Sequence, residues 1–341
     1  MNRIAVVTGA SAGVGRATAV EFARHGWRVA LLARGVDGLE GARRDVEAAG
    51  GKAMAIPTDV ADHAQVEAAA ERIEREWGPI DVWVNDAMAT IFCEFLDIAP
   101  EDFRRATEVT YLGTVYGTLA ALKRMKPRNR GAIIQVGSAL AYRSIPLQSA
   151  YCGAKSAIRG FTDSLRSELI HDRCDVGLTM VQLSAFNTPQ FDWGRTCMPN
   201  QPKPLGKIFQ PEVAARGIYW AAQHRRRELW LGWPAAQAIL GTRLIPGLLD
   251  RYLARAAYGG QQSDKPVSPD RRDNLYQPVP GDHGAHGRFD DQAIPDSAQL
   301  HLVTHRWLTL AAGLPILALG LLAARGSARG SKKRASRLLK R

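Results

Sequence analysis

The chain has 341 residues, of which 46% are apolar, and a formal net charge of +12. This length and composition are typical of a globular protein with one large domain and further segments, and they exclude an intrinsically disordered chain. Residues 325–341 hold eight Lys and Arg and no acidic residue, so the basic charge describes a tail rather than the whole surface. Without interleaved aromatic residues this tail does not predict nucleic-acid binding.

The cysteines and histidines show no spacing typical of a metal site. Cys93, Cys152, Cys174 and Cys197 include no C-x-x-C pair, and the eight histidines form no ligand cluster. The sequence has no signal-peptide pattern before its first apolar run. We therefore expect four reduced thiols in a cytosolic setting and no metal.

The N-terminus predicts a nucleotide site. Residues 3–8 (RIAVVT) predict a strand, a glycine-rich turn over 9–15 follows it, and a helical pattern continues through His25. Such a turn lets backbone N–H groups approach a pyrophosphate at the start of the helix. Its spacing, G-x-x-x-G-x-G, differs from the standard G-x-G-x-x-G, and glycine also serves ordinary tight turns.

A second strand, 28–33, is followed by Arg34 rather than by an acidic residue. In dinucleotide-binding folds an acidic residue near this point binds the ribose 2′-hydroxyl, and an arginine accommodates the 2′-phosphate of NADP. The sequence therefore favours NADP(H) over NAD(H). The alternative is that Arg34 is a solvated loop residue.

Strands and helices then alternate along the chain. Further strands are predicted at 52–57, 80–84, 132–136, 176–183 and 228–232, and helices at 36–49, 62–77, 101–125, 151–171 and 211–225. This alternation predicts a Rossmann-like α/β fold, with a doubly wound parallel sheet of about seven strands and helices on both faces. Asp59, Asn85 and Ser138 follow strands, at the edge where ligands bind such sheets.

The stretch from Ser138 to Lys155 carries the strongest catalytic pattern. Tyr151 and Lys155 lie four residues apart, so on a helix they share one face. An ammonium near a phenol favours the phenolate and lowers the phenol pKa, which predicts a general acid-base group in Tyr151. Ser138 is expected to bind the same substrate oxygen. Taken alone, a Tyr-x-x-x-Lys pair also occurs by chance.

Several motifs in order resemble the short-chain dehydrogenase/reductase family, across roughly residues 2–232. The motifs are TGASAGVG (8–15), Asp59-Val60, Asn85-Asp86-Ala87, Ser138, the Tyr151/Lys155 pair and Asn187-Thr188. The resemblance implies hydride transfer between NAD(P)(H) and a carbonyl/alcohol pair, with Ser138, Tyr151 and Lys155 as catalytic residues. It implies cofactor binding by Gly9, Ser11, Gly13, Val14, Gly15, Arg34, Asp59, Val60, Asn85, Ala87, Tyr151, Lys155 and Thr188, and a homodimer or homotetramer paired through long helices.

Four positions depart from the family pattern. Asp86 stands where the family usually has a second asparagine. Met88 stands where the family has glycine, and Ser184 where it often has proline. Thr110 matches the position at which the family often has an asparagine in a proton relay. Threonine is shorter, so we expect a changed relay.

The remaining chain predicts a flap and a membrane-associating end. Residues 189–210 suit a substrate flap or an ordinary long loop. Beyond the predicted catalytic domain, 1–232, we expect an amphipathic helical extension at 233–258 broken at Pro246-Gly247, for which membrane contact and a pocket-closing or dimer role are equal alternatives. A linker at 259–300 is expected to pack through Leu275, Tyr276 and Phe289.

Residues 301–324 are predicted to associate with a membrane, ahead of the polybasic tail at 325–341. Residues 307–324 carry no charge and as a helix would be about 27 Å long, close to the about 30 Å of a bilayer core. Together with the tail they predict lipid contact through 301–341, either spanning or lying in the bilayer, with the catalytic domain facing the cytoplasm. A buried core helix is the alternative.

These features predict a membrane-associated NADP(H)-dependent oxidoreductase, with a small lipophilic carbonyl or alcohol as substrate. The alternative is a catalytically inactive, membrane-tethered nucleotide-binding sensor or scaffold, for which Met88 and Thr110 would mark lost activity.

Overall fold

A computed structural model describes residues 3–305. They fall into two compact units, one ending at Ser297 and one beginning at Ala298. The first unit contains the sheet and all the site residues considered below. Of the second, the described part is helix α11 (Ala298–Thr304).

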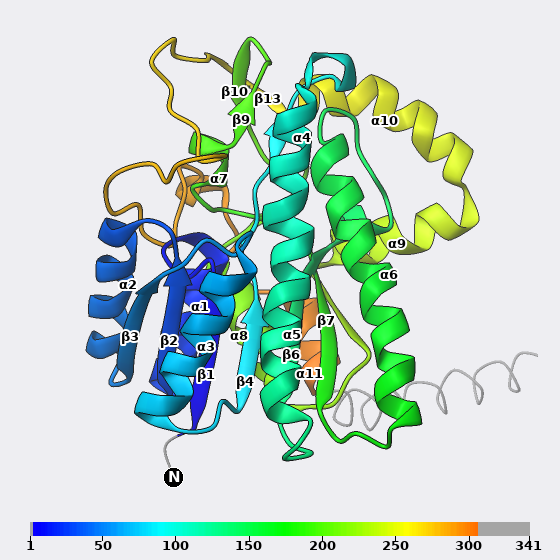
Figure 1. The fold of residues 1–341 in the computed structure, drawn as a ribbon. Helices are drawn as coiled ribbons and strands as arrows, with labels where there is room; N and C mark the ends of the chain where they lie inside the picture. Colours follow the sequence, from blue (N-terminus) through cyan, green and yellow to red (C-terminus); the bar gives the residue numbers. More distant parts are fainter. Residues whose placement is uncertain (1–2, 306–341) are drawn as a thin grey trace, which may run out of the picture. The chain divides into compact units, whose positions relative to one another are not determined.

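The first unit is built on a seven-stranded sheet in the order β12-β7-β6-β4-β1-β2-β3, and all six strand pairings are parallel (Figure 1). The strands are β1 (Ile4–Thr8), β2 (Arg28–Ala33), β3 (Lys52–Pro57), β4 (Val82–Asn85), β6 (Ala132–Ser138), β7 (Gly177–Leu183) and β12 (Glu228–Leu231). The predicted Rossmann-like sheet is therefore confirmed. Strand order reverses between β1 and β4, so ligands are expected at the carboxyl ends of these two strands.

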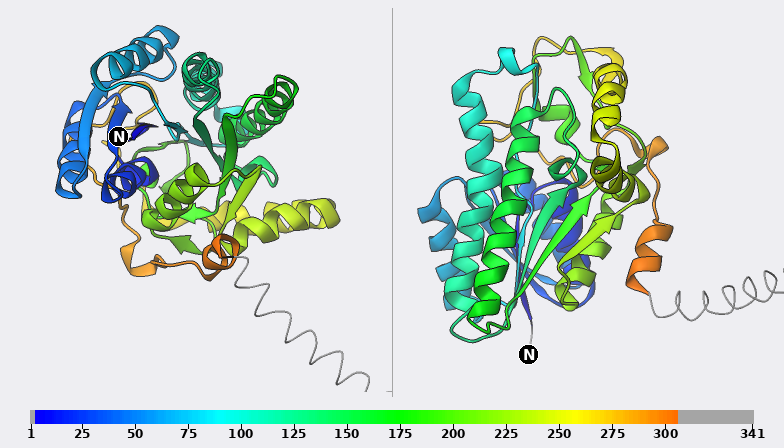
Figure 2. Two further views of the ribbon diagram at one scale, coloured as in Figure 1. Left: turned by 90° about the horizontal axis from the view of Figure 1, so that it is seen from below. Right: turned by 90° about the vertical axis from the view of Figure 1, so that its right-hand side faces the viewer.

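Helices cover both faces of the sheet (Figure 2). One face carries α1 (Gly13–Arg24), α2 (Val36–Ala48) and α8 (Pro211–Gln223). The other carries α3 (His63–Trp77), α4 (Pro100–Thr107), α5 (Gly113–Met125) and α6 (Ser149–His171). Buried aliphatic side chains of the central strands fill both interfaces, as a sheet covered on both faces requires.

The predicted long helix at 101–125 is interrupted. A π-helical turn, Glu108–Leu112, separates α4 from α5. The turn contains Thr110, whose buried hydroxyl donates to the carbonyl oxygen of Ala89 at 3.0 Å and accepts from its N–H at 2.9 Å. Such turns often lie at functional sites, and this one joins the helix to the segment that follows β4.

The segments beyond the carboxyl ends of the strands form small additional sheets (Figure 1). β5 (Ile91–Phe92) pairs with β9 (Arg195–Thr196), β8 (Ala185–Phe186) with β11 (Ile208–Phe209), and β10 (Asn200–Pro202) with β13 (Gln262–Pro266). Residues 189–210, predicted as a flap or loop, thus hold helix α7 (Gln190–Trp193) and three short strands.

The amphipathic stretch forms two helices, α9 (Trp233–Leu244) and α10 (Pro246–Gly260), and the chain breaks at Pro246 as predicted. Three short 3-10 helices complete the described elements: η1 (Phe95–Asp97), η3 (Ala139–Ala141) and η4 (Asp290–Gln292). In the segment expected to pack back, Leu275 is fully buried and Phe289 is buried, whereas Tyr276 is 44% exposed.

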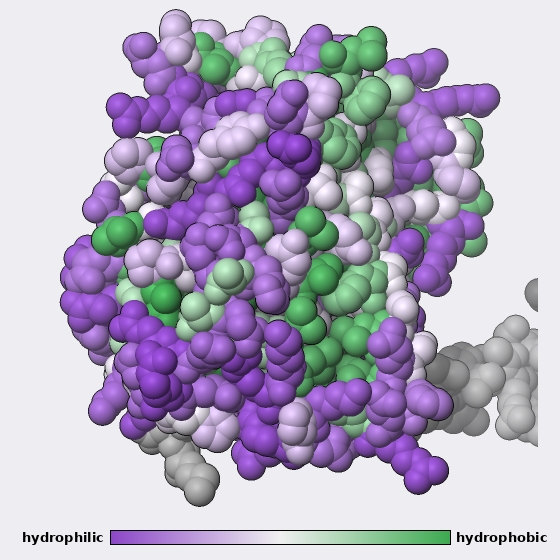
Figure 3. All heavy atoms as spheres, in the orientation of Figure 1, coloured by the Kyte–Doolittle hydropathy of each residue, from purple (hydrophilic) through white to green (hydrophobic). Residues whose placement is uncertain are grey.

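Within residues 3–305 no helix combines the length and apolar character needed to cross a bilayer. The predicted membrane segment 307–324 and the tail 325–341 lie outside the described residues. Leu119 of α5 is 43% exposed. Figure 3 shows apolar surface on the face that α5 and α6 form. This is where pairing through long helices would occur, and pairing stays a prediction.

Candidate active site

The glycine turn after β1 makes one wall of a deep pocket. Gly9 and Gly13 have φ of +71° and +58°, a conformation that side chains disfavour. At Gly15 a Cβ atom would lie 2.4 Å from the carbonyl oxygen of Gly9, so the start of α1 packs against the turn itself. The pocket is lined by Gly9, Ser11, Gly13 and Val14, among others. This close backbone cradle fits a dinucleotide pyrophosphate.

The adenosine end of the predicted site carries paired charges. Arg34, Asp59 and Val60 all line the pocket. Asp59 forms an ion pair with Arg105 at 2.5 Å, and its other oxygen accepts from the N–H of Ala61 at 3.0 Å. Arg34 is not a solvated loop residue. Its guanidinium donates to three backbone carbonyl oxygens of residues 274–276, and burial lowers its pKa.

Ser138, Tyr151 and Lys155 come together at the other end. Ser138 ends β6, and Tyr151 and Lys155 lie one turn apart on α6. The Ser138 hydroxyl accepts from the N–H of Leu140 at 3.1 Å and lies close enough to the Tyr151 phenol to lower its pKa. Lys155 donates from Nζ to the carbonyl oxygen of Val136 at 2.6 Å, and its Nζ lies 5.6 Å from the centre of the Tyr151 ring. This arrangement can hold a substrate oxygen and move a proton.

Burial is the main cause of the pKa shifts of Tyr151 and Lys155. It raises the pKa of Tyr151, and the Ser138 hydroxyl acts in the opposite direction. The expected lowering of the Tyr151 pKa by Lys155 is therefore wrong for this structure, because desolvation of the phenolate outweighs the favourable contacts. Burial also lowers the pKa of Lys155 to about 8.

Asp86 is a site residue that the motif analysis did not single out. It lines the pocket, and its N–H, like that of Ala87, donates to the Thr8 hydroxyl, at 3.0 and 3.1 Å. Burial raises the pKa of its carboxyl to about 7, while the charge of Lys155 and the N–H of Gly15 oppose that shift. The sequence did carry a signal for this residue, because aspartate stands at position 86, where the resemblance implies an asparagine.

Asn85 and the departures at 88 and 110 have separate structural roles. Asn85 is buried inside the sheet, where it donates to Gln135 at 2.9 Å and to Thr118 at 3.1 Å and accepts from Trp83 at 2.9 Å. Met88 lines the pocket. The Thr110 hydroxyl is occupied by the backbone of Ala89 and does not replace an asparagine side chain.

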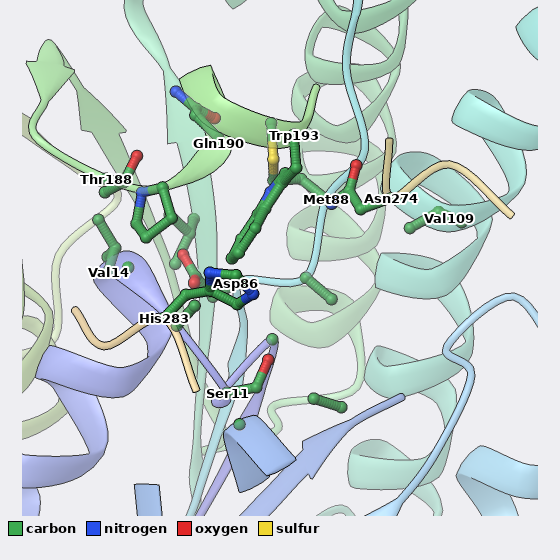
Figure 4. A pocket seen from close by; sticks show the side chains of 18 of the residues that line it. Ser11, Val14, Asp86, Met88, Val109, Thr188, Gln190, Trp193, Asn274 and His283 are labelled. Atoms are coloured by element: carbon green, nitrogen blue, oxygen red, sulfur yellow. The ribbon is translucent and has the colours of Figure 1, made fainter. Parts of the chain in front are cut away.

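Residues 189–210, called the flap below, border the pocket near its catalytic end, and their movement stays a prediction. Thr188, Gln190 and Trp193 line the pocket, and Figure 4 shows Trp193 beside Met88. A disulfide between Cys93 and Cys197 joins the flap to the segment after β5. The expectation of four reduced thiols is therefore wrong for this pair. The two cysteines are 104 residues apart, and the pairing of β5 with β9 brings them together.

Residues 274–283 also contribute to the pocket, although the sequence did not predict them to be part of the site. Asn274, Pro278, Val279, Gly281 and His283 line the pocket. His283 meets Trp193 edge-on, with ring centres 4.8 Å apart, so this segment and the flap touch across the pocket (Figure 4).

Comparisons with known proteins agree with this geometry. The family model described as short chain dehydrogenase matches residues 3–193. An uncharacterised oxidoreductase of Bacillus subtilis, YxnA, is 33% identical over 285 residues, covering 83% of this chain and 80% of that protein. The 3-dehydrosphinganine reductase of Danio rerio is 32% identical over 219 residues, covering 62% of this chain and 65% of that protein.

Solved structures give the same result. An alcohol dehydrogenase from Thermococcus sibiricus, complexed with 5-hydroxy-NADP, is 28% identical to this chain with a TM-score of 0.59. The match covers 68% of this chain and 96% of the dehydrogenase chain. A metagenomic short-chain oxidoreductase in complex with NADP is 25% identical with a TM-score of 0.57, and the match covers 67% of this chain and 96% of that chain.

The buried carboxyl of Asp86 makes stability depend on pH. Its pKa is about 7 in the folded protein and near 3.9 in an unfolded chain. Between these two pH values Asp86 is protonated in the folded protein and ionised in the unfolded chain. The free energy of unfolding therefore falls as pH rises from about 4 to about 7. Asp86→Asn keeps an oxygen for the Gly15 N–H and removes this loss. We expect it to gain on the order of 2–4 kcal/mol over the wild type at pH 7.5 and little at pH 4.

Urea unfolding of both proteins at the two pH values measures this difference. Exposed Asp291 provides the control substitution, Asp291→Asn. An Asp86→Asn protein whose stability relative to the wild type is the same at both pH values would show that Asp86 is ionised throughout.

Proposed function

Because the chain belongs to the short-chain dehydrogenase family of oxidoreductases, we propose that it is an NADP(H)-dependent reductase of a lipophilic ketone or aldehyde. The observation that carries the proposal is one pocket lined by the glycine turn, the partly buried Tyr151 and the buried Lys155. In this pocket the bound nicotinamide would supply the hydride.

Tyr151 is the proposed general acid. The phenol is protonated at neutral pH whether or not burial raises its pKa, so it can donate a proton to a carbonyl oxygen. Ser138, at the end of β6 beside Tyr151, orients that oxygen. The Lys155 ammonium, fixed by the carbonyl of Val136, stabilises the phenolate left behind. The same groups run the reverse reaction when the phenolate accepts a proton from an alcohol.

The lining of the pocket supports a lipophilic substrate. Met88, Val136, Phe186 and Trp193 contribute apolar side chains near the catalytic end. A relative named as a reductase of 3-dehydrosphinganine agrees with this class. We propose a carbonyl compound with an extended apolar part, and short polar ketones should react more slowly.

Tyr151→Phe tests the role of the phenol. The substitution removes the transferable proton and keeps the ring, so we expect turnover of lipophilic ketones to fall about 10²- to 10⁴-fold. NADPH binding, followed by its fluorescence, should change little. Tyr258→Phe, on α10, is the matched control. Cofactor binding without turnover in the wild-type protein would instead support the alternative of an inactive nucleotide-binding scaffold.

The preference for NADP(H) rests on Arg34. This cation lines the adenosine end of the pocket, and two solved structural neighbours hold NADP or a derivative of it. Arg34→Ala should raise the Kd for NADPH about 10- to 100-fold more than it raises the Kd for NADH, since a charged hydrogen-bond partner of the phosphate is lost. The accompanying loss of the Arg34 bonds to residues 274–276 acts on both cofactors alike. Arg24→Ala, on α1, is the control. Equal losses for both cofactors would contradict a 2′-phosphate role.

Membrane contact is proposed through α9 and α10. Their exposed face carries Leu244, Ile245 and Leu248, which are 78%, 48% and 61% exposed. Arg251 and Arg255 are exposed beside them on α10. An apolar face flanked by arginines fits the surface of an anionic bilayer without spanning it.

Vesicle co-sedimentation of the full chain tests this contact. The wild type should bind phosphatidylcholine vesicles that contain phosphatidylserine better than phosphatidylcholine vesicles alone. Replacing Leu244 and Leu248 together by Gln should weaken binding at least about 10-fold, because each leucine loses burial worth more than about 1.4 kcal/mol. Leu96→Gln, at an exposed leucine of η1, is the control. Unchanged binding of the double variant would place the contact elsewhere in the chain.

A further inference from the structure

Residues 273–290, here called the strap, cross the open side of the predicted cofactor pocket. They follow α10 and β13 in the chain, yet they return to the carboxyl ends of β1 and β2, where Figure 1 shows them as a gold to orange loop. The strap is attached to the domain at three places, and these lie on different sides of the pocket.

The first attachment is to the β2 side. Leu275 is fully buried in the main core cluster. Its carbonyl oxygen accepts from Nη1 of Arg34 at 3.3 Å and from Nε of Arg105 at 3.2 Å, and that of Tyr276 accepts from Arg34 at 2.9 Å. The first turn of the strap is therefore fixed to Arg34, which lines the pocket, and to Arg105, which pairs with Asp59 of the pocket wall.

The second attachment is to the glycine turn and its helix. Asp282 forms ion pairs with Arg16 of α1 and, at 3.4 Å, with Arg44 of α2. The Gly281 N–H donates to Asp37 at 2.9 Å. The carbonyl oxygen of Gly284 accepts from the N–H of Gly13 at 3.2 Å, so strap backbone lies directly against the turn expected to bind the pyrophosphate.

The third attachment is to the flap side. The N–H of Phe289 donates to Oδ1 of buried Asn187 at 3.0 Å, and Asn187 donates to Asp290 at 2.8 Å. The Phe289 ring packs edge-on against Phe191 of α7, with centres 5.7 Å apart. The strap therefore joins the β2 side, the glycine turn and the flap, which are the three sides of the pocket.

Between these attachments the strap presents groups to the pocket interior. Asn274, Pro278, Val279, Gly281 and His283 line it. The Oδ1 atom of Asn274 is buried, and among residues 3–305 it has no hydrogen-bond partner. A buried amide oxygen without a partner is costly, and it points to a donor on a molecule that the pocket takes up.

We infer that the strap is a cofactor-binding element that closes over the dinucleotide, with Asn274 accepting a hydrogen bond from it and Asp282 holding the strap shut. This inference rests on the proposed function, because it names further residues of the same site. The ends of the strap are held by buried Leu275 and Phe289, whereas its middle is held by exposed or half-buried polar contacts. The middle, 277–287, is therefore the part that opens for exchange.

The side chains of Asn274 and Asp282 act separately from Arg34, which the strap holds through backbone carbonyl oxygens. Asn274 is an uncharged acceptor, so its bond should serve NADPH and NADH alike. Asp282 contacts Arg16 and Arg44 rather than Arg34. Loss of either side chain should thus change how long either cofactor stays bound, without changing the preference between them.

The test measures release of NADPH and NADH from the full-length protein by stopped-flow fluorescence after a chase with excess oxidised cofactor. Asp282→Asn should speed release of both about 10- to 100-fold, since charged hydrogen bonds to Arg16 are lost. Asn274→Ala should raise the Kd of both about 3- to 10-fold. Asp264→Asn makes the same chemical change at an exposed position of β13 and should release cofactor at the wild-type rate.

The outcomes separate this inference from the proposed function. A wild-type protein that binds neither cofactor removes the proposed function itself. If the wild type binds, and both strap variants keep wild-type melting temperatures, release rates and affinities, the strap is a structural segment and the inference is overturned. A selective loss of NADPH alone in Asn274→Ala would overturn the assignment of that residue.

Discussion

The hydrogen bond from Nζ of Lys155 to the carbonyl oxygen of Val136 holds a buried ammonium between α6 and β6. A buried charge is tolerated when it is hydrogen-bonded and faces an opposite charge, and here the nearby carboxyl of Asp86 provides that charge. This bond fixes the rotation of α6 against the sheet, and with it the place of Tyr151. The rest of the pocket is arranged around these groups, with the glycine turn on one side and Ser138 on the other.

Much of the fold was predictable because it depends on short-range patterns. Each strand of the main sheet is mainly apolar and has Gly, Asn, Asp or Ser at its end or within the two residues after it. The spacing of Tyr151 and Lys155 places both on one helix face whatever surrounds them. The motif residues of the glycine turn and of β4 follow from the same order, since parallel strands bring their carboxyl ends to one edge.

The rest depends on contacts between distant parts of the chain. The strap has the Pro, Gly and Asp content of a linker, and its path is set by Arg16, Arg34 and Asn187, which precede it by about 100 to 270 residues. Cys93 and Cys197 lack a recognisable spacing because the pairing of β5 with β9 brings them together. The direction of the Tyr151 pKa shift was missed for a related reason, since spacing reveals the neighbouring cation but not the depth of burial.

Burial connects the strap and flap with the proton chemistry. Desolvation is the largest cause of the raised pKa of Tyr151, the raised pKa of Asp86 and the lowered pKa of Lys155. The contact of His283 with Trp193 joins the two covers over this group. A motion that admits water would therefore move all three pKa values back toward their ordinary ranges at once. In the proposed mechanism the strap and flap would therefore exclude water from the groups that move the proton, while the Tyr151 phenol stays protonated at neutral pH in either state.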